Sequence, residues 1–99
     1  MTYDDIVEKT FEWAQEIKKC PEYEHEKLIE DYVRFSNWVV FPEQAWEVID
    51  LFRRNNSWVW IDVTDRFHIE QRNTDQFASE LATDLLAEQL RGELEHEDI

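Results

Sequence analysis

The sequence is poor in the residues that make tight turns and covalent cross-links. Its 99 residues include one glycine, two prolines and one cysteine. Phosphate-cradling loops and nucleophile elbows need glycine where the backbone bends sharply or approaches a ligand, yet the single glycine, Gly92, lies near the end of the chain. The scarcity of glycine therefore argues against nucleotide-binding and hydrolase architectures. The lone thiol of Cys20 cannot form an internal disulfide, which fits a reducing cytoplasm.

Positive charge and long apolar runs are also scarce. Ten Lys and Arg against 24 Asp and Glu leave a formal net charge of −14. Without a basic surface to displace counterions from phosphate, we expect binding neither to nucleic acid nor to an anionic membrane. The longest apolar run, residues 38–41, is far too short to cross a bilayer, and no basic-then-apolar signal segment opens the chain. These absences predict a protein of the cytoplasm.

Enough apolar sequence is present to form one hydrophobic core. Forty-two per cent of the residues are apolar, and the aromatic residues include five Trp. Apolar residues recur at three- and four-residue steps in four segments, which predicts four amphipathic helices. These helices are expected over residues 3–19, 22–36, 43–54 and 75–92, with Thr2 and Asp5 as a capping pair, Pro42 opening the third helix and Asn73-Thr74 capping the last.

The pattern changes between the third and the last of these helices. Residues 57–63 alternate with a period of two, which predicts a strand, and a turn at 64–65 could return it as a hairpin through 67–69. Gly92 ends or weakens the last helix, and the acidic tail 93–99 is expected to fray. The expected fold is a single compact domain over 1–99, mainly α, with a small β strand or hairpin near 57–70 and a buried connector at 38–41.

The residues that usually carry catalysis form no motif. The three His residues lie far apart, and although His25-Glu26 resembles the start of a zinc-protease motif, Ile29 occupies the position of its second His. Cys20 has no His near it in the sequence, and no motif surrounds any Ser. We expect no enzymatic activity, no metal site and no cofactor.

The acidic residues, in contrast, follow a regular pattern. Like charges four apart on a helix repel one another and cost a few tenths of a kcal/mol per pair. Only four Lys are available in the chain to offset this cost. The carboxylates at four-residue spacing are Asp4, Glu8, Glu12 and Glu16, then Glu22, Glu26 and Glu30, then Glu43 and Glu47, and finally Glu80, Asp84 and Glu88.

Two interpretations of this pattern follow. The first is a solvated acidic face that serves solubility or adaptation to salt. The second is that the carboxylates stand in for the phosphates of DNA. Duplex DNA carries one charge per roughly 1.7 Å of helix axis, so a charge of −14 corresponds to about 24 Å of duplex. Carboxylates four residues apart on one helix rise about 6 Å per step, so several helices must combine to match the density of phosphates.

The first twelve residues, MTYDDIVEKTFE, resemble the start of the Ocr family of phage antirestriction proteins, which mimic B-form DNA. Met1, Thr2, Tyr3 and Glu12 match the family, and Asp4, Asp5, Ile6, Glu8 and Phe11 are conservative replacements. The order of later segments is also similar: a Pro-led helix over 42–52, an apolar and acidic segment over 58–62, and an acidic helix over 74–90. The chain departs from the family in its shorter length, its reduced acidic tail, its five Trp, and Arg53, Arg54, Arg66 and Arg72.

The resemblance implies a homodimeric, mostly helical DNA mimic. It would occupy the DNA-binding groove of a type I restriction–modification enzyme and block both cleavage and methylation, with the spaced carboxylates as its binding surface. Trp58 and Trp60 would share one face of the predicted strand, where they are candidates for the dimer interface. The alternative function is an acidic inhibitor of another defence system, such as an anti-CRISPR, or an immunity protein that caps a basic toxin. An immunity protein should concentrate its carboxylates in one patch, whereas a DNA mimic should spread them.

Overall fold

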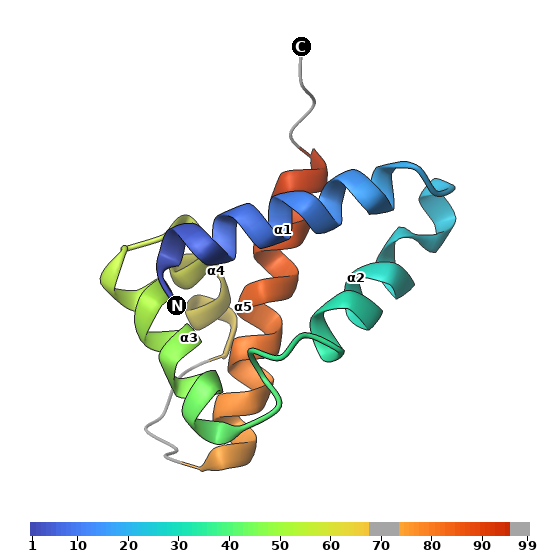
Figure 1. Ribbon diagram of the computed structural model, residues 1–99. Helices are drawn as coiled ribbons and strands as arrows, with labels where there is room; N and C mark the ends of the chain where they lie inside the picture. The colour runs from blue at the N-terminus through green and yellow to red at the C-terminus, as the bar shows by residue number, and fades with distance from the viewer. Residues whose placement is uncertain (68–73, 96–99) are drawn as a thin grey trace.

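The computed structural model describes residues 1–67 and 74–95 and is mainly helical, as the sequence predicts (Figure 1). Within these residues there is no strand. The four expected helices are present, the second with a short 3₁₀ turn before it, and a further helix occupies the segment predicted as a strand. The elements are α1 (Tyr3–Lys18), η1 (Glu22–Glu24), α2 (His25–Arg34), α3 (Pro42–Arg54), α4 (Trp58–Phe67) and α5 (Asp75–Glu95).

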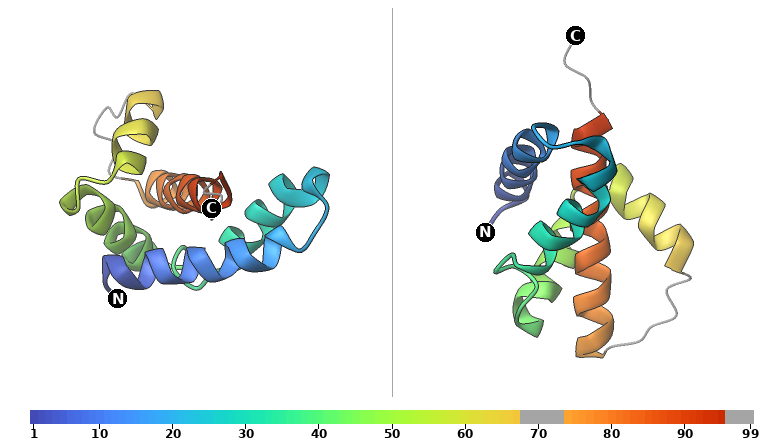
Figure 2. Two further views of the ribbon diagram at one scale, coloured as in Figure 1. Left: turned by 90° about the horizontal axis from the view of Figure 1, so that it is seen from above. Right: turned by 90° about the vertical axis from the view of Figure 1, so that its right-hand side faces the viewer.

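The longest helix, α5, forms the centre of the fold. Viewed along its axis, the other helices are arranged around it (Figure 2), and each of α1, α2, α3 and α4 packs against it. Pairs of neighbouring positions, such as Leu81 with Ala82 and Leu85 with Leu86, are buried along its length. A helix in contact with partners on several sides must bury a wide band instead of a narrow stripe. The core therefore follows α5 from end to end.

Local sequence determines where several helices begin. At the start of α1, the Asp5 backbone N–H donates to Thr2 Oγ1 at 3.2 Å and the Thr2 N–H donates to Asp5 Oδ2 at 2.7 Å, which completes the predicted capping box. These bonds to Thr2 lower the pKa of the Asp5 carboxyl. Pro42 occupies the first turn of α3. The Thr74 hydroxyl accepts from the Phe77 N–H at 3.1 Å and caps α5, whereas Asn73 lies outside the described residues.

The predicted strand at 57–63 is wrong, because these residues form the start of α4. Val59 and Val63 are fully buried, and both a strand and a helix bring residues four apart to the same side. The two interpretations differ at Ile61, which a strand would bury with Val59 but which is 57% exposed in the structure. Ser57 caps the helix, since its hydroxyl accepts from the Val59 N–H at 3.2 Å. The return strand at 67–69 is also wrong at Phe67, the last residue of α4; residues 68–69 lie outside the described part of the chain.

Two smaller expectations also fail. In the connector 38–41, Val39 is buried but Val40 and Phe41 are exposed, so only half of it belongs to the core. The last helix does not end at Gly92, because α5 continues to Glu95. Residues 93–95 are helical and residues 96–99 lie outside the described chain, so the predicted fraying of the tail stays a prediction.

Gly92 makes room for an aromatic ring of α4. A Cβ atom at this position would lie 2.6 Å from Cζ2 and 2.9 Å from Cη2 of Trp58. Both distances are far below van der Waals contact, so a larger residue would displace the indole. Glycine inside a helix costs about 1 kcal/mol relative to alanine, and here that cost permits the close packing of α4 on α5.

We expect Gly92→Ala to stabilise the fold by different amounts in two backgrounds. In a Trp58→Ala protein it should stabilise the fold by about 1 kcal/mol, because only helix propensity changes. In the natural sequence most of that gain should be lost, because the indole of Trp58 must move away from the new methyl group. Urea unfolding of the four proteins of this double-mutant cycle measures the difference. An equal gain in both backgrounds would show that Trp58 does not restrict position 92.

Candidate partner-binding surface

The first acidic row follows the outer face of α1. Asp4, Glu8, Glu12 and Glu16 are all exposed, while Ile6, Trp13 and Ile17 of the same helix face the core. Lys9 Nζ lies 3.3 Å from Glu12 Oε2, and Lys19 Nζ lies 3.3 Å from Glu16 Oε1. Both ion pairs are solvent-exposed and worth less than about 1 kcal/mol each, so they leave these carboxylates available to another cation.

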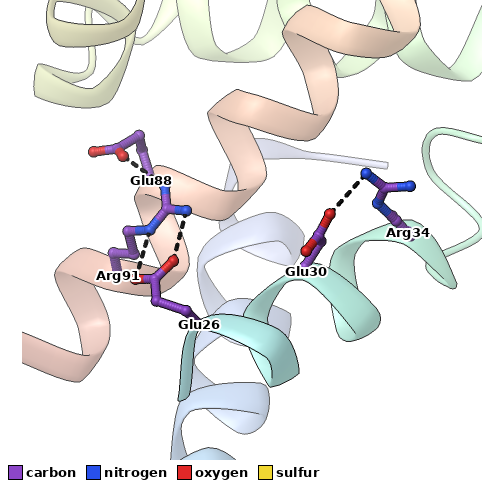
Figure 3. Close-up of polar contacts among 5 residues, drawn as sticks. All are labelled: Glu26, Glu30, Arg34, Glu88 and Arg91. Carbon is purple, nitrogen blue, oxygen red and sulfur yellow. Dashed lines mark hydrogen bonds and ion pairs between the residues drawn. The ribbon is translucent and has the colours of Figure 1, made fainter. Parts of the chain in front are cut away.

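The second acidic group lies where α2 and α5 run side by side (Figure 3). Arg91 of α5 donates two hydrogen bonds to Glu26 of α2, from Nε to Oε1 at 3.2 Å and from Nη2 to Oε2 at 3.1 Å. The same guanidinium donates from Nη1 to Glu88 at 2.7 Å. Further along α2, Arg34 Nη2 lies 2.7 Å from Glu30 Oε1. On α5, in the two turns before Glu88, Glu80 is exposed and Asp84 is half-buried.

Arg91 has a structural role in this group. The hydrogen bonds that the Arg91 guanidinium donates to Glu26 are the main cause that raises its pKa, partial burial opposes the rise, and the bond to Glu88 adds to it. A two-donor contact between residues 65 apart in the sequence ties α2 to α5. Glu26 therefore links α2 to α5 at the surface, while Glu88 pairs with Arg91 within α5, and both contribute negative charge.

The third row, on α3, meets the start of α1. Glu47 Oε1 lies 3.7 Å from the N-terminal ammonium of Met1, and Glu43 is exposed one helical turn earlier. Glu22, in η1, is exposed as well. Within residues 1–67 and 74–95, some of the predicted carboxylates have neither an ion-pair nor a hydrogen-bond partner. These are Asp4, Glu8, Glu22 and Glu43.

The predicted site residues are thus distributed over α1, η1, α2, α3 and α5. In the view of Figure 3, the α1 ribbon lies behind the α2–α5 group. The molecule measures 39 × 25 × 24 Å. A duplex 39 Å long carries about 23 phosphate charges, so the net charge of −14 is about 60% of that density. Charge is spread along the protein, but more sparsely than along DNA.

Sequence periodicity did not identify the exposed apolar residues of the surface. Phe35, Val40 and Phe41 are exposed around the link between α2 and α3, with Phe35 83% exposed. On α4, Trp58 is 52% exposed beside Ile61, whereas Trp60 packs partly against the core. Because 58–63 is helical, Trp58 and Trp60 do not share a face as a strand would require, and the exposed pair is Trp58 with Ile61. Exposed aromatic and aliphatic residues such as these are available for contact with another protein.

The described residues contain no arrangement typical of a metal centre or membrane anchor. No group of three or more His, Cys, Asp or Glu in this part of the chain is placed to hold a metal ion. An imidazole nitrogen of His25 lies 2.9 Å from the Cys20 carbonyl oxygen, a contact that closes the turn before α2. Among the helices described, none combines the length and apolar character needed to span a membrane.

Comparisons with known proteins give no relatives. No family model matches the chain, and no curated protein or solved structure matches it at a significant level.

Proposed function

We propose that this protein is a DNA mimic that inhibits a type I restriction–modification enzyme. The observation that carries the proposal is the exposed row on α1, where Asp4, Glu8, Glu12 and Glu16 repeat at four-residue steps although like charges at this spacing repel. The similarity of residues 1–12 to the Ocr family points to the same function. The distribution of the other carboxylates over α2, α3 and α5 favours a DNA mimic over a protein with one acidic patch.

The proposed mechanism relies on electrostatics and a rigid shape. A groove that binds DNA presents Lys and Arg to phosphates, and an array of carboxylates held on helices offers it the same charge. The array is already ordered in the folded protein, so binding requires little further loss of conformational entropy. Long-range attraction should also make association fast and sensitive to salt. In this proposal the protein acts in the host cytoplasm, does not bind nucleic acid or membrane itself, and has neither catalytic activity nor a cofactor.

We propose that two copies form the active unit. A homodimer would double the charge and extend the acidic surface to about the length of two 7-base-pair segments. The exposed pair Trp58 and Ile61 on α4 supplies an apolar contact for a second copy. This contact replaces the Trp58–Trp60 face that the sequence suggested.

An assay of both activities of a purified type I restriction–modification enzyme tests the proposal. Occupation of the shared DNA-binding groove should abolish cleavage and methylation over the same range of inhibitor concentration. Loss of cleavage with full methylation would contradict groove occupancy, and so would inhibition that excess duplex DNA fails to relieve.

A second candidate function is inhibition of another DNA- or RNA-handling protein, as an anti-CRISPR or as an immunity protein that caps a basic toxin. The exposed apolar residues Phe35, Val40 and Phe41 favour it, because apolar and aromatic side chains are common in protein–protein interfaces. Inhibition of an RNA-guided nuclease or a basic nuclease toxin, together with full activity of the restriction–modification enzyme, would favour this candidate.

A further inference from the structure

An aromatic pocket lies between α1 and the end of α2. It has a volume of about 460 Å³, and three of its walls are the rings of Trp13, Tyr32 and Trp38. The Trp13 ring stands between the other two, with ring centroids 6.0 Å from Tyr32 and 5.8 Å from Trp38. Phe35, which is largely exposed, forms part of the rim. The volume is in the range of pockets that bind small molecules or the anchoring side chains of a partner.

Two polar groups in this pocket are without partners. Ser36 is 92% buried, from a relative exposure of 8%, yet its Oγ makes no hydrogen bond. Asp31, also in the lining, is half-buried, and within residues 1–67 and 74–95 its carboxylate has neither an ion-pair nor a hydrogen-bond partner. Buried hydroxyls are normally satisfied, because an unpaired one costs free energy. The half-buried Asp31 carboxylate can accept a hydrogen bond from a ligand, whereas Ser36 Oγ is buried beneath the lining.

The charge around the pocket favours a cation. Lys9 is the one basic residue in the lining, and its ammonium lies 3.3 Å from Glu12 Oε2, which offsets its charge. Asp31 adds a negative charge inside the pocket, and the protein as a whole carries −14. Aromatic faces attract cations through their quadrupole, most strongly in the case of Trp.

We infer that this pocket binds an arginine side chain of the protein partner. A guanidinium is planar and weakly hydrated, so it stacks on indole and phenol rings more favourably than an ammonium does. Its N–H donors form a planar fork that matches a carboxylate, which in this pocket is Asp31. This inference rests on the proposed function, because proteins that bind DNA are rich in exposed arginine. The pocket would supply a specific anchor beside the acidic row of α1.

The test uses the ¹⁵N-labelled full-length protein alone, titrated with N-acetyl-arginine amide. We expect saturable shifts of the indole N–H signals of Trp13 and Trp38 and of the Ser36 amide. N-acetyl-lysine amide should cause weaker shifts, and N-acetyl-citrulline amide, which has nearly the same shape without the charge, should cause none. Asp31→Asn should weaken arginine binding at least about fivefold, whereas Asp62→Asn, an exposed carboxylate on α4, should leave it unchanged.

Several outcomes would overturn the inference. Equal shifts with citrulline would exclude recognition of charge, and equal shifts with lysine would exclude a preference for guanidinium. Shifts spread along α1 that persist in the Asp31→Asn protein would show general cation binding. Absence of shifts at the pocket would overturn it directly, and this result would leave the restriction-enzyme assays unaffected because those are measured separately. Conversely, arginine binding in the pocket combined with no inhibition of the restriction enzyme would refute only the proposed function.

Discussion

Replacing Glu8, Glu12 and Glu16 with lysine will leave the protein folded and weaken its binding to the target enzyme at least about tenfold. The three carboxylates are exposed and lie on the face of α1 that points away from the core. Reversal changes the charge of this row by six units and sets lysines against the basic groove that the row is proposed to fill. The exposed ion pairs with Lys9 and Lys19 are lost, and their contribution to stability is small.

A matched variant separates the row on α1 from net charge. Asp62, Asp65 and Glu95 are exposed and lie outside the proposed rows, so their replacement with lysine changes the total charge by the same six units. The affinity of each protein for the enzyme, measured by displacement of labelled DNA, should fall much further for the α1 variant. An equal fall in both would mean that net charge alone determines binding. No fall in the α1 variant would remove α1 from the binding surface.

The second large effect concerns the core, where Phe52→Ala should destabilise the fold by about 3–5 kcal/mol. Phe52 of α3 is fully buried, and its ring meets the edge of Tyr3 at a centroid distance of 5.6 Å. Alanine would leave a cavity where α3 meets the core and would remove the contact with the start of α1. A loss of this size is a large share of the 5–15 kcal/mol typical of small domains.

Urea unfolding followed by circular dichroism measures this loss, with Phe41→Ala as the control. Phe41 is 60% exposed at the start of α3, so its truncation should change the free energy of unfolding by no more than about 0.5 kcal/mol. A change below 1 kcal/mol for Phe52→Ala, or an equal change for the two variants, would contradict the packing described for the core.

The helices that the sequence predicted well are those with an unambiguous period and a local cap. In α1 the pattern of Ile6, Trp13 and Ile17 agrees with the capping box at Thr2, so propensity and burial lead to the same answer. The segment that became α4 lacked this agreement. Its Val and Trp residues favour a strand by intrinsic propensity. Val59 and Val63 are the residues of this segment that are fully buried, and their four-residue spacing is compatible with a strand or a helix. Tertiary packing and the cap at Ser57 decided in favour of the helix.

The candidate site divides in a similar way. Four-residue spacing was sufficient to predict that the carboxylates of α1 lie on one exposed face, because a single helix determines their arrangement. The hydrogen bonds from Arg91 to Glu26 depend on how α2 packs against α5. The pocket around Trp13 depends on how α2 packs against α1. No local pattern encodes these contacts between distant residues. The same is true of Trp58, whose packing beside Gly92 required the structure.

The most direct test of DNA mimicry is displacement of labelled duplex DNA from a type I restriction–modification enzyme by this protein, measured at several salt concentrations. The proposal predicts full displacement, an affinity that falls steeply as salt rises, and no binding of the protein to the duplex itself. Failure to displace DNA at low salt from a panel of such enzymes would contradict the proposal. An affinity of the protein for the enzyme that is independent of salt, after correction for the salt dependence of DNA binding, would also contradict it, because carboxylates that replace phosphates must depend on the same electrostatic attraction.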